Sequence, residues 1–420
     1  MSRLFILALA VALLSACAGT ATVPDPVAVA PETEGQPEPP EPVERPFPDD
    51  SVYPLLVAEF ALRRRNYDVA LENYLTQAQI LRDAGVSAHT THLTQFMRRE
   101  REAMEAAQLW VELEPDNAEA QNTLANLLLR QGRSLEALPH LAAVQRLGSP
   151  ARFPTLLNGF EQLDAQQQTE LVEGINALAR EWPDNTQLLM TQALLHAEFE
   201  QFPQALKKLD ALFKIEPYQP QAILLEARVL MATGDKKPFA RLEQAVADKP
   251  KDQELRLQYA RLLTASDMPA ARKQFEILSA QSPRDGDLLL SLALINRETG
   301  DDVAAKAYLK QMLALQQRVD EAHFYLGRIA EDQGDPQQAI SHYLQVEGEA
   351  EFLSANLRIG QILIGNGEQA QAQALFLEQR KAYPDRAEQI FSLEADLLTQ
   401  ADEVPSALQV LNQGVRQFPD

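Results

Sequence analysis

The sequence predicts an all-α solenoid of about eleven helix-turn-helix repeats, preceded by a leader and an extended linker. Three observations carry this prediction. Small residues recur about every 34 positions from residue 51 onward. A second small-residue series follows the first in register, 12 positions later. Before residue 51 the pattern is absent, and the chain consists of an apolar run followed by a tract rich in proline and acidic residues.

The first element, residues 1–16, is predicted to be a cleaved lipoprotein signal peptide. Arg3 precedes an uncharged apolar run of eleven residues, 4–14, which is too short to cross a bilayer because a spanning helix needs about 20. The run ends in Leu14-Ser15-Ala16-Cys17, which resembles the lipobox of bacterial lipoproteins. The resemblance implies that the Cys17 sulfur carries a diacylglycerol and that Cys17 begins the mature chain. The alternative is an ordinary leader that happens to contain a cysteine.

Lipidation would hold the protein on a membrane without a transmembrane helix, because several acyl chains anchor stably where one does not. In the lipoprotein family an aspartate after the cysteine favours retention in the inner membrane, whereas this chain has Ala18. The resemblance therefore implies a lipid anchor in the outer membrane, with the body facing the periplasm.

The second element, residues 17–50, is predicted to be a disordered tether. Residues 18–50 contain nine prolines, eight acidic residues and one basic residue, so they have little apolar surface to bury. Polyproline II geometry would give them a reach of roughly 100 Å.

The acidity of the chain limits its partners. The net charge is −22, of which the tether supplies −7, so the body is acidic as well. This argues against a nucleic-acid-binding protein, which needs a basic face. It also predicts that the body contacts the membrane only through its lipid anchor.

The third element, residues 51–420, carries the repeats. In each unit a small residue is expected in the first helix and another in the second helix, because small residues let the two helices pack closely. The first series is Ala58, Thr91, Ala125, Gly159, Ala193, Ala227, Ala260, Ala293, Gly327, Gly360 and Ala395. The second series is Ala70, Ala103, Ala137, Leu171, Ala205, Phe239, Arg272, Ala305, Ala339, Ala372 and Ala407.

This pattern resembles the tetratricopeptide repeat (TPR), which implies a right-handed superhelix. The third unit, AEAQNTLANLLLRQGRSLEALPHLAAVQRL over residues 118–147, shows the pattern most fully. Turn glycines are predicted in the left-handed conformation after the first helix. Asn117, Asn185 and Asp285 each follow a proline by two residues and are predicted to cap the next helix. The predicted turn glycines are Gly132, Gly234, Gly300, Gly334 and Gly367.

Several units depart from the pattern. Leu171, Phe239 and Arg272 stand where alanine is expected, and a shift of one residue would bring Ala271 into place in the seventh unit. The sixth unit has Asp235-Lys236-Lys237-Pro238 at its turn, which predicts a short hairpin. The repeats run to Asp420 without an evident polar cap. Because solenoid ends need caps, we expect either a truncated chain or an end covered by a partner.

The sequence contains no evident catalytic or metal-binding motif. Of six histidines only His89 and His92 are close in sequence, and a metal site needs a third ligand, which the spacing does not supply. No nucleophile elbow, phosphate-binding glycine loop or cysteine cluster is present. We therefore expect a non-enzymatic protein with no cofactor and no metal.

Function is then expected on a protein-binding groove. In TPR folds the first helix of each hairpin lines the concave face, and the residue after the small marker points into it. Arg228 and Arg261 have no acidic residue at i±3 or i±4 and are free to bind a carboxylate, whereas Arg328 has Glu331 and Asp332 at i+3 and i+4, which predicts local pairing. The alternative for these arginines is a solvated side chain or a salt bridge between repeats. The candidate groove residues are Asn122, Asn126, Arg130, Met190, Arg228, Arg261, Phe324 and Arg328.

Two stretches suggest a narrower family. YPLLVAEFALRRRNYDVALENYLTQAQILRD, residues 53–83, and LWVELEPDNAEA, residues 109–120, are similar to LbcA-type lipoproteins of Gram-negative bacteria. The resemblance implies an adaptor that binds a periplasmic carboxyl-terminal processing protease and brings it substrates such as cell-wall hydrolases. Alternatives are a lipoprotein activator of a peptidoglycan synthase, an assembly scaffold for secretion, pili or exopolysaccharide, and a cell-wall enzyme.

Overall fold

The computed structural model describes residues 48–418 and confirms the all-α solenoid. Within that range the chain forms twenty-one α-helices and three 3-10 helices, with no strand. The predicted signal peptide, Cys17 and most of the predicted tether lie outside the described residues. The first helix begins at Asp49, two residues before the expected start of the repeats at Ser51.

The helices follow one another with short connections. Their bounds are α1 Asp49–Arg63, α2 Tyr67–Leu81, α3 Ala84–Phe96, α4 Glu100–Leu113, α5 Ala118–Arg130, α6 Ser134–Arg146, η1 Phe153–Leu157, η2 Phe160–Gln162, α7 Ala165–Glu181, α8 Thr186–Glu198, α9 Phe202–Ile215, α10 Pro220–Ala232, α11 Ala240–Asp248, α12 Gln253–Leu263, α13 Met268–Gln281, α14 Gly286–Glu298, α15 Asp302–Leu315, α16 Val319–Asp332, α17 Pro336–Tyr343, α18 Glu349–Gly365, α19 Gln369–Ala382, η3 Pro384–Arg386, α20 Ala387–Gln400 and α21 Val404–Gln417.

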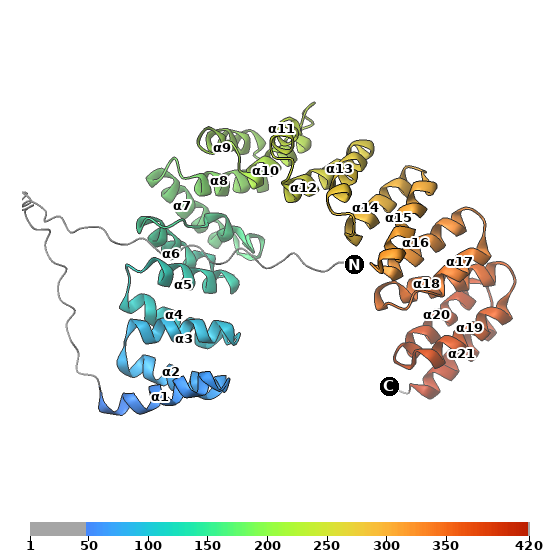
Figure 1. Cartoon of the computed structure of the whole chain (residues 1–420), viewed down its shortest axis with the longest axis horizontal. Coiled ribbons are helices and arrows are strands. Elements are labelled where there is room, and N and C mark those ends of the chain that lie inside the picture. Colours follow the sequence, from blue (N-terminus) through green and yellow to red (C-terminus); the bar gives the residue numbers. More distant parts are fainter. Residues whose placement is uncertain (1–47, 419–420) are drawn as a thin grey trace, which may run out of the picture.

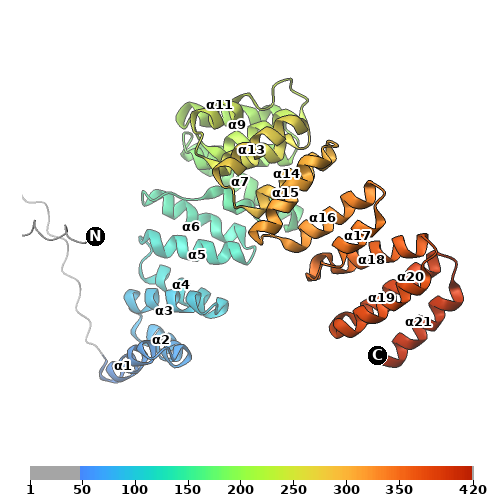
Figure 2. The same ribbon diagram turned by 45° about the vertical axis from the view of Figure 1, so that its right-hand side comes forward.

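Consecutive helices pair into hairpins that stack into an arch (Figure 1), with α1 and α21 at its two ends. Figure 2 shows the same arch from a second direction. Around the top of the arch, α9, α11 and α13 lie on the outer side, whereas α8, α10 and α12 lie toward the inside. In these three hairpins the first helix therefore faces the inner side of the arch, as the TPR pattern predicts.

The predicted small residues lie where the two helices of a hairpin meet. Ala125 and Ala137 in the third unit are fully buried, and so are Ala193 and Ala205 in the fifth. Buried leucine, isoleucine and phenylalanine side chains from neighbouring hairpins fill the space between these contacts, as in the core cluster that runs from Leu189 to Ile295. Each hairpin thus completes its core against the next one, which is how a solenoid gains stability.

The predicted turns and caps are present. All five turn glycines have positive φ, as at Gly132 with φ of 72°, and this left-handed conformation carries a Cβ penalty that glycine avoids. Asn117 accepts hydrogen bonds from the backbone N–H groups of Glu119 and Ala120 at 2.9 and 3.1 Å. Asn185 and Asp285 cap α8 and α14 in the same way.

The fourth unit differs from the prediction because it has no first α-helix. Gly159, expected in the middle of that helix, has φ of 77° and separates two short 3-10 helices, η1 and η2. The buried side chains of Phe153, Leu156 and Phe160 fill the space. The left-handed conformation of Gly159 interrupts the helical backbone, whereas Pro154 lies in the first turn of η1, where the missing N–H of proline costs no helical hydrogen bond.

The sixth and seventh units confirm the expected departures. The second helix of the sixth unit, α11, has only nine residues, and Phe239 is its N-cap residue. In the seventh unit Ala271 is fully buried at the hairpin contact, whereas the Arg272 side chain is 41% exposed. The register shift predicted from the sequence is therefore correct.

Candidate protein-binding surface

The residue after the small marker of each first helix is accessible from outside the hairpin. Asn126, Arg228, Arg261 and Gln361 are exposed, and Leu194, Leu294 and Arg328 are half-buried. This position recurs once per hairpin, so its side chains form a row along the first helices. The row mixes amide, guanidinium and aliphatic groups, which together can bind both the backbone and the side chains of a polypeptide.

Arg228 on α10 and Arg261 on α12 are exposed and make no ion pair or side-chain hydrogen bond within residues 48–418. They occupy equivalent positions of the sixth and seventh hairpins. The acid closest in sequence to Arg228 is Glu226, which is paired with Arg241 at 2.8 Å. Both guanidinium groups are therefore available to a carboxylate, as the spacing predicts.

The local pairing expected for Arg328 is wrong. Glu331 accepts hydrogen bonds from Arg358 Nε at 3.0 Å and from the Tyr343 hydroxyl at 2.9 Å. Asp332 pairs with Arg297 at 2.9 Å. Arginines of the following and preceding units thus occupy both carboxylates, and the buried Nε atom of Arg328 has no hydrogen-bond partner in the described chain.

Two other candidate groove residues belong to the core. Met190 is only 5% exposed and packs in the cluster around α8–α14, so its expected role in the groove is wrong. Phe324 is half-buried, and its ring lies 5.8 Å from that of Tyr343. Both side chains fill space between helices, and the ring contact of Phe324 is with the second helix of its own hairpin.

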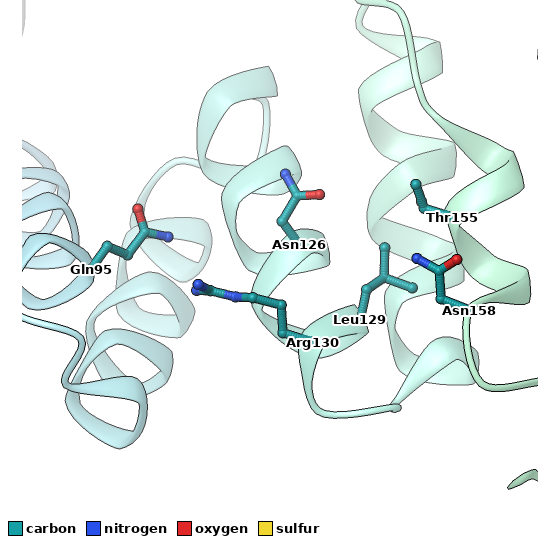
Figure 3. Close-up of a pocket in the computed structure, with 6 residues that line it drawn as sticks. All are labelled: Gln95, Asn126, Leu129, Arg130, Thr155 and Asn158. Atoms are coloured by element: carbon teal, nitrogen blue, oxygen red, sulfur yellow. The ribbon is translucent and has the colours of Figure 1, made fainter. Parts of the chain in front are cut away.

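Candidates on α5 contribute to an open pocket of about 430 Å³ between α3, α5 and η1 (Figure 3). Asn126 and Arg130 come from α5, and Asn122 lies one turn earlier on the same helix and is half-buried. Figure 3 shows the Arg130 side chain extending toward Gln95. The lining residues are Gln95, Asn126, Leu129, Arg130, Thr155 and Asn158.

The chemistry of this pocket favours a peptide. Three carboxamides, Gln95, Asn126 and Asn158, supply both donors and acceptors of the kind that pair with a backbone. Arg130 adds a positive charge, and no acidic residue lines the pocket. The sequence did not indicate Gln95, Thr155 or Asn158, because the pocket depends on η1 replacing the expected helix. Gly159 was the only signal of that replacement.

The histidines pack against neighbouring side chains. The His89 ring lies 4.6 Å from that of Tyr74, and His92 Nε2 lies 3.5 Å from Glu119. His323 and His342 meet with their Nδ1 atoms 3.2 Å apart. Within residues 48–418 no group of three or more histidine, cysteine, aspartate or glutamate residues is arranged to hold a metal ion.

Sequence comparison finds similarity to TPR proteins. The tetratricopeptide-repeat family profile matches residues 260–315 and 302–352. The TPR repeat-containing protein PA4667 of Pseudomonas aeruginosa is 32% identical over 377 residues, covering 89% of this chain. The alignment covers 64% of that relative, so the chain spans less than two thirds of its length.

Solved structures with a similar arrangement share little sequence identity. Yeast Tom70 is 13% identical, with 87% of this chain and 92% of that chain covered and a TM-score of 0.34. A TPR protein from Parabacteroides merdae is 14% identical, with 67% and 98% covered and a TM-score of 0.38.

Proposed function

We propose that this tetratricopeptide-repeat solenoid is a membrane-anchored scaffold that binds protein partners on the inner side of its arch. The observation that carries the proposal is the row of accessible side chains along the first helices, with Arg228 and Arg261 unpaired. Charged groups without a partner inside the molecule are suited to one outside it. The amide-lined pocket around Asn126 and Arg130 extends this surface toward the N-terminal units.

The anchor is the lipid proposed for Cys17, which lies outside the described residues. Within residues 48–418 none of the helices is both long and apolar enough to cross a bilayer. Lipidation at the predicted lipobox would attach the chain to the outer membrane on its periplasmic side. Cys17→Ala is expected to release the protein from the membrane fraction while its helical circular dichroism stays unchanged. Sedimentation of the variant with membranes after salt and carbonate washes would contradict the anchor.

The partner we propose is a carboxyl-terminal processing protease, held together with its substrates, including cell-wall hydrolases. Support comes from the similarity of residues 53–83 and 109–120 to LbcA-type lipoproteins. Binding both proteins on one scaffold raises their effective concentration without new chemistry. Because the arch has many hairpins, separate sets of first helices can hold the two partners.

The test is capture from detergent-solubilised envelope extracts followed by mass spectrometry. Recovery of a serine protease with cell-wall hydrolases supports the proposal. Recovery of a peptidoglycan synthase, or of secretion, pilus or exopolysaccharide machinery, would instead identify the chain as an activator or an assembly scaffold.

A charge-reversal variant tests whether the groove arginines are involved. Arg228→Glu with Arg261→Glu is expected to reduce partner recovery by at least about tenfold, since removing one member of a charge pair costs about 2 kcal/mol or more and 1.4 kcal/mol is a factor of ten. The matched control is Arg180→Glu with Arg284→Glu, which changes the charge equally at two other exposed arginines. Equal recovery of partners by both variants would rule out a role for Arg228 and Arg261 in partner binding.

A further inference from the structure

The turns after α1 and α3 hold arginine where other units hold glycine. Arg65 and Arg98 have φ of 61° and 58°, in the left-handed region. In five other units the residue at this point is glycine, as at Gly132 and Gly300. A residue with a Cβ is disfavoured in this conformation. Glu200 and Asp402 adopt the same conformation after α8 and α20, so the two arginine turns are distinguished by their positive charge and not by their backbone strain.

These turns expose four free guanidinium groups. The side chains of Arg63, Arg64, Arg65 and Arg98 are exposed and form no ion pair or hydrogen bond with other described residues. Residues 60–68 carry three arginines against one aspartate, a net charge of +2 in a chain of −22. That aspartate, Asp68, is already paired with Arg99 at 3.0 Å. Glu100 is the exposed acid closest in sequence to the second turn.

The two turns form one continuous surface. The ring of Tyr67, just after the first turn, lies 5.4 Å from the ring of Phe96, just before the second. The ion pair between Asp68 and Arg99 joins the same two turns. We call this surface the arginine edge and define it as Arg63, Arg64, Arg65 and Arg98 together with Phe60 and Phe96.

Large apolar side chains project beside these charges. Phe60 is 59% exposed and Phe96 is 69% exposed. On the same face of α1, Tyr53 is 76% exposed and Leu56 is 51% exposed. Helical spacing places Tyr53, Leu56 and Phe60 in one stripe that ends at Arg63. An apolar and aromatic stripe bordered by arginine is the pattern of helices that lie in a membrane interface.

We infer that the arginine edge rests on the surface of an anionic phospholipid bilayer. Arginine binds phosphate bidentately, and phenylalanine and tyrosine rings settle at the boundary between headgroups and acyl chains. The inference goes beyond the proposed scaffold function. It rests on one part of that proposal, namely that the protein is located at a membrane. It also departs from the expectation that the body meets the membrane through its anchor alone. The overall charge of −22 does not prevent the contact, because screening at physiological salt limits repulsion to about 8 Å.

The location of the edge matters for the scaffold. It lies on the first two hairpins, at the end of the arch that directly follows the proposed tether. Contact there would fix the orientation of the solenoid on the membrane, which an anchor at Cys17 alone would not do. The inner side around Arg228 and Arg261 belongs to later hairpins and would stay free for protein partners.

The test measures flotation of the purified full chain with vesicles. Cys17→Ser is introduced first, so that any binding belongs to the body and a failure of the lipid anchor is scored separately. Vesicles of phosphatidylethanolamine with phosphatidylglycerol are compared with vesicles of phosphatidylethanolamine with phosphatidylcholine. We expect the protein to float with the anionic vesicles only, and less so as salt is raised.

Two variants with the same charge change distinguish the edge from general electrostatics. Replacing Arg63, Arg64, Arg65 and Arg98 by glutamine should lower partitioning by roughly tenfold or more. The control replaces four other exposed arginines, Arg152, Arg180, Arg284 and Arg416, by glutamine and should leave partitioning unchanged. Phe60→Ser with Phe96→Ser should weaken binding even at low salt, because insertion of the rings does not depend on charge.

Three results would overturn the inference. One is equal flotation with both kinds of vesicle, and another is an equal loss in the edge variant and the control. The third is no flotation at all combined with loss of an acidic protein partner from the edge variant, which would assign the surface to that protein. Because a quadruple variant could misfold, Arg65→Gly with Arg98→Gly serves as a second test. It removes two charges at turns that favour glycine and should give a partial loss of binding.

Discussion

Gly327 on α16 and Tyr343 on α17 are in contact so close that a Cβ atom built on Gly327 would lie 2.6 Å from Tyr343 Cε1. The Tyr343 ring is buried and its hydroxyl donates a hydrogen bond to Glu331 at 2.9 Å. The ring therefore has no room to move away. A single hydrogen atom in place of a side chain sets the distance between the two helices of the ninth hairpin.

We predict that Gly327→Ala destabilises the protein by about 1–3 kcal/mol, the usual cost of overpacking a core. The measurement is the urea unfolding transition followed by circular dichroism. Gly365→Ala is the matched control, because a Cβ at that helical glycine has no heavy atom within 4 Å. The control should be neutral or stabilising by about 0.5 kcal/mol. A Gly327→Ala variant as stable as the control would contradict the close contact.

The strained turns predict a gain in stability. Arg65→Gly and Arg98→Gly should each stabilise the protein by about 1 kcal/mol, because glycine relieves the left-handed strain. The reciprocal change, Gly132→Arg at φ of 72°, should destabilise it by a similar amount. Thermal melts of the three variants check the set. A loss of stability in both glycine variants would show that the arginine side chains contribute to the fold.

The ion pair between Arg380 and Glu394 is predicted to be costly to break, because the two side chains are 8% and 2% exposed. Burial raises the pKa of the Glu394 carboxyl, whereas the hydrogen bond and charge of Arg380 oppose that rise. Arg380→Met would leave a buried carboxylate unpaired and should cost about 3–5 kcal/mol. Adding Glu394→Leu should recover most of this loss. Urea unfolding at neutral pH measures both, and a double variant no more stable than the single one would refute the explanation.

The contact between His323 and His342 predicts sensitivity to mild acid. Burial lowers the pKa of both imidazoles. Lys306, Lys310 and His323 lower the pKa of His342 further, whereas Asp320 acts in the opposite direction on His323. Folded-state pKa values below the ordinary value of 6.5 mean that the unfolded chain takes up protons first. Stability is therefore full above about pH 6.5 and is lost as the pH falls below it.

The measurement is the urea midpoint between neutral pH and about pH 5. His323→Gln with His342→Gln should flatten part of this dependence, since an amide pair does not titrate. His140, whose pKa is also lowered by burial, accounts for a further part in the same direction. An unchanged pH profile in the double variant would exclude the pair as a source.

Much of this fold could be predicted because the residues that determine each hairpin lie within about 34 positions of sequence. Small residues, turn glycines and Asn or Asp caps recur with the period, and each acts within its own unit, so reading one unit predicts the next. The same method misplaced Gly159, because the register suggested a helix where the left-handed glycine separates two 3-10 turns. It also gave no sign that Arg65 and Arg98 adopt the turn conformation, since neither is glycine.

The binding surface was harder to predict because its ion pairs form between side chains of different repeat units. Helical spacing suggested that Arg328 pairs with Glu331 and Asp332, but Arg358 and Arg297 of the neighbouring units take both carboxylates. Met190 lies on a first helix, as the groove prediction requires, but packing against the next hairpin buries it. Residue spacing within one helix indicates only which side chains of that helix are close to each other. The partners of these side chains come from neighbouring repeats, which the spacing does not describe.

The ion pairs that link successive units also affect how the arch responds to force. Arg146 with Glu181, Arg297 with Asp332 and Arg318 with Asp287 each join one unit to the next, at 3.1, 2.9 and 2.7 Å. Each hairpin contacts only its neighbours, so a force applied between the two ends of the arch acts on every interface between successive hairpins. Because the core is shared between neighbouring hairpins, a small change of angle at each interface disturbs the packing less than a large change at one interface. We therefore expect the arch to change its curvature by small angles at many interfaces and not by a single hinge.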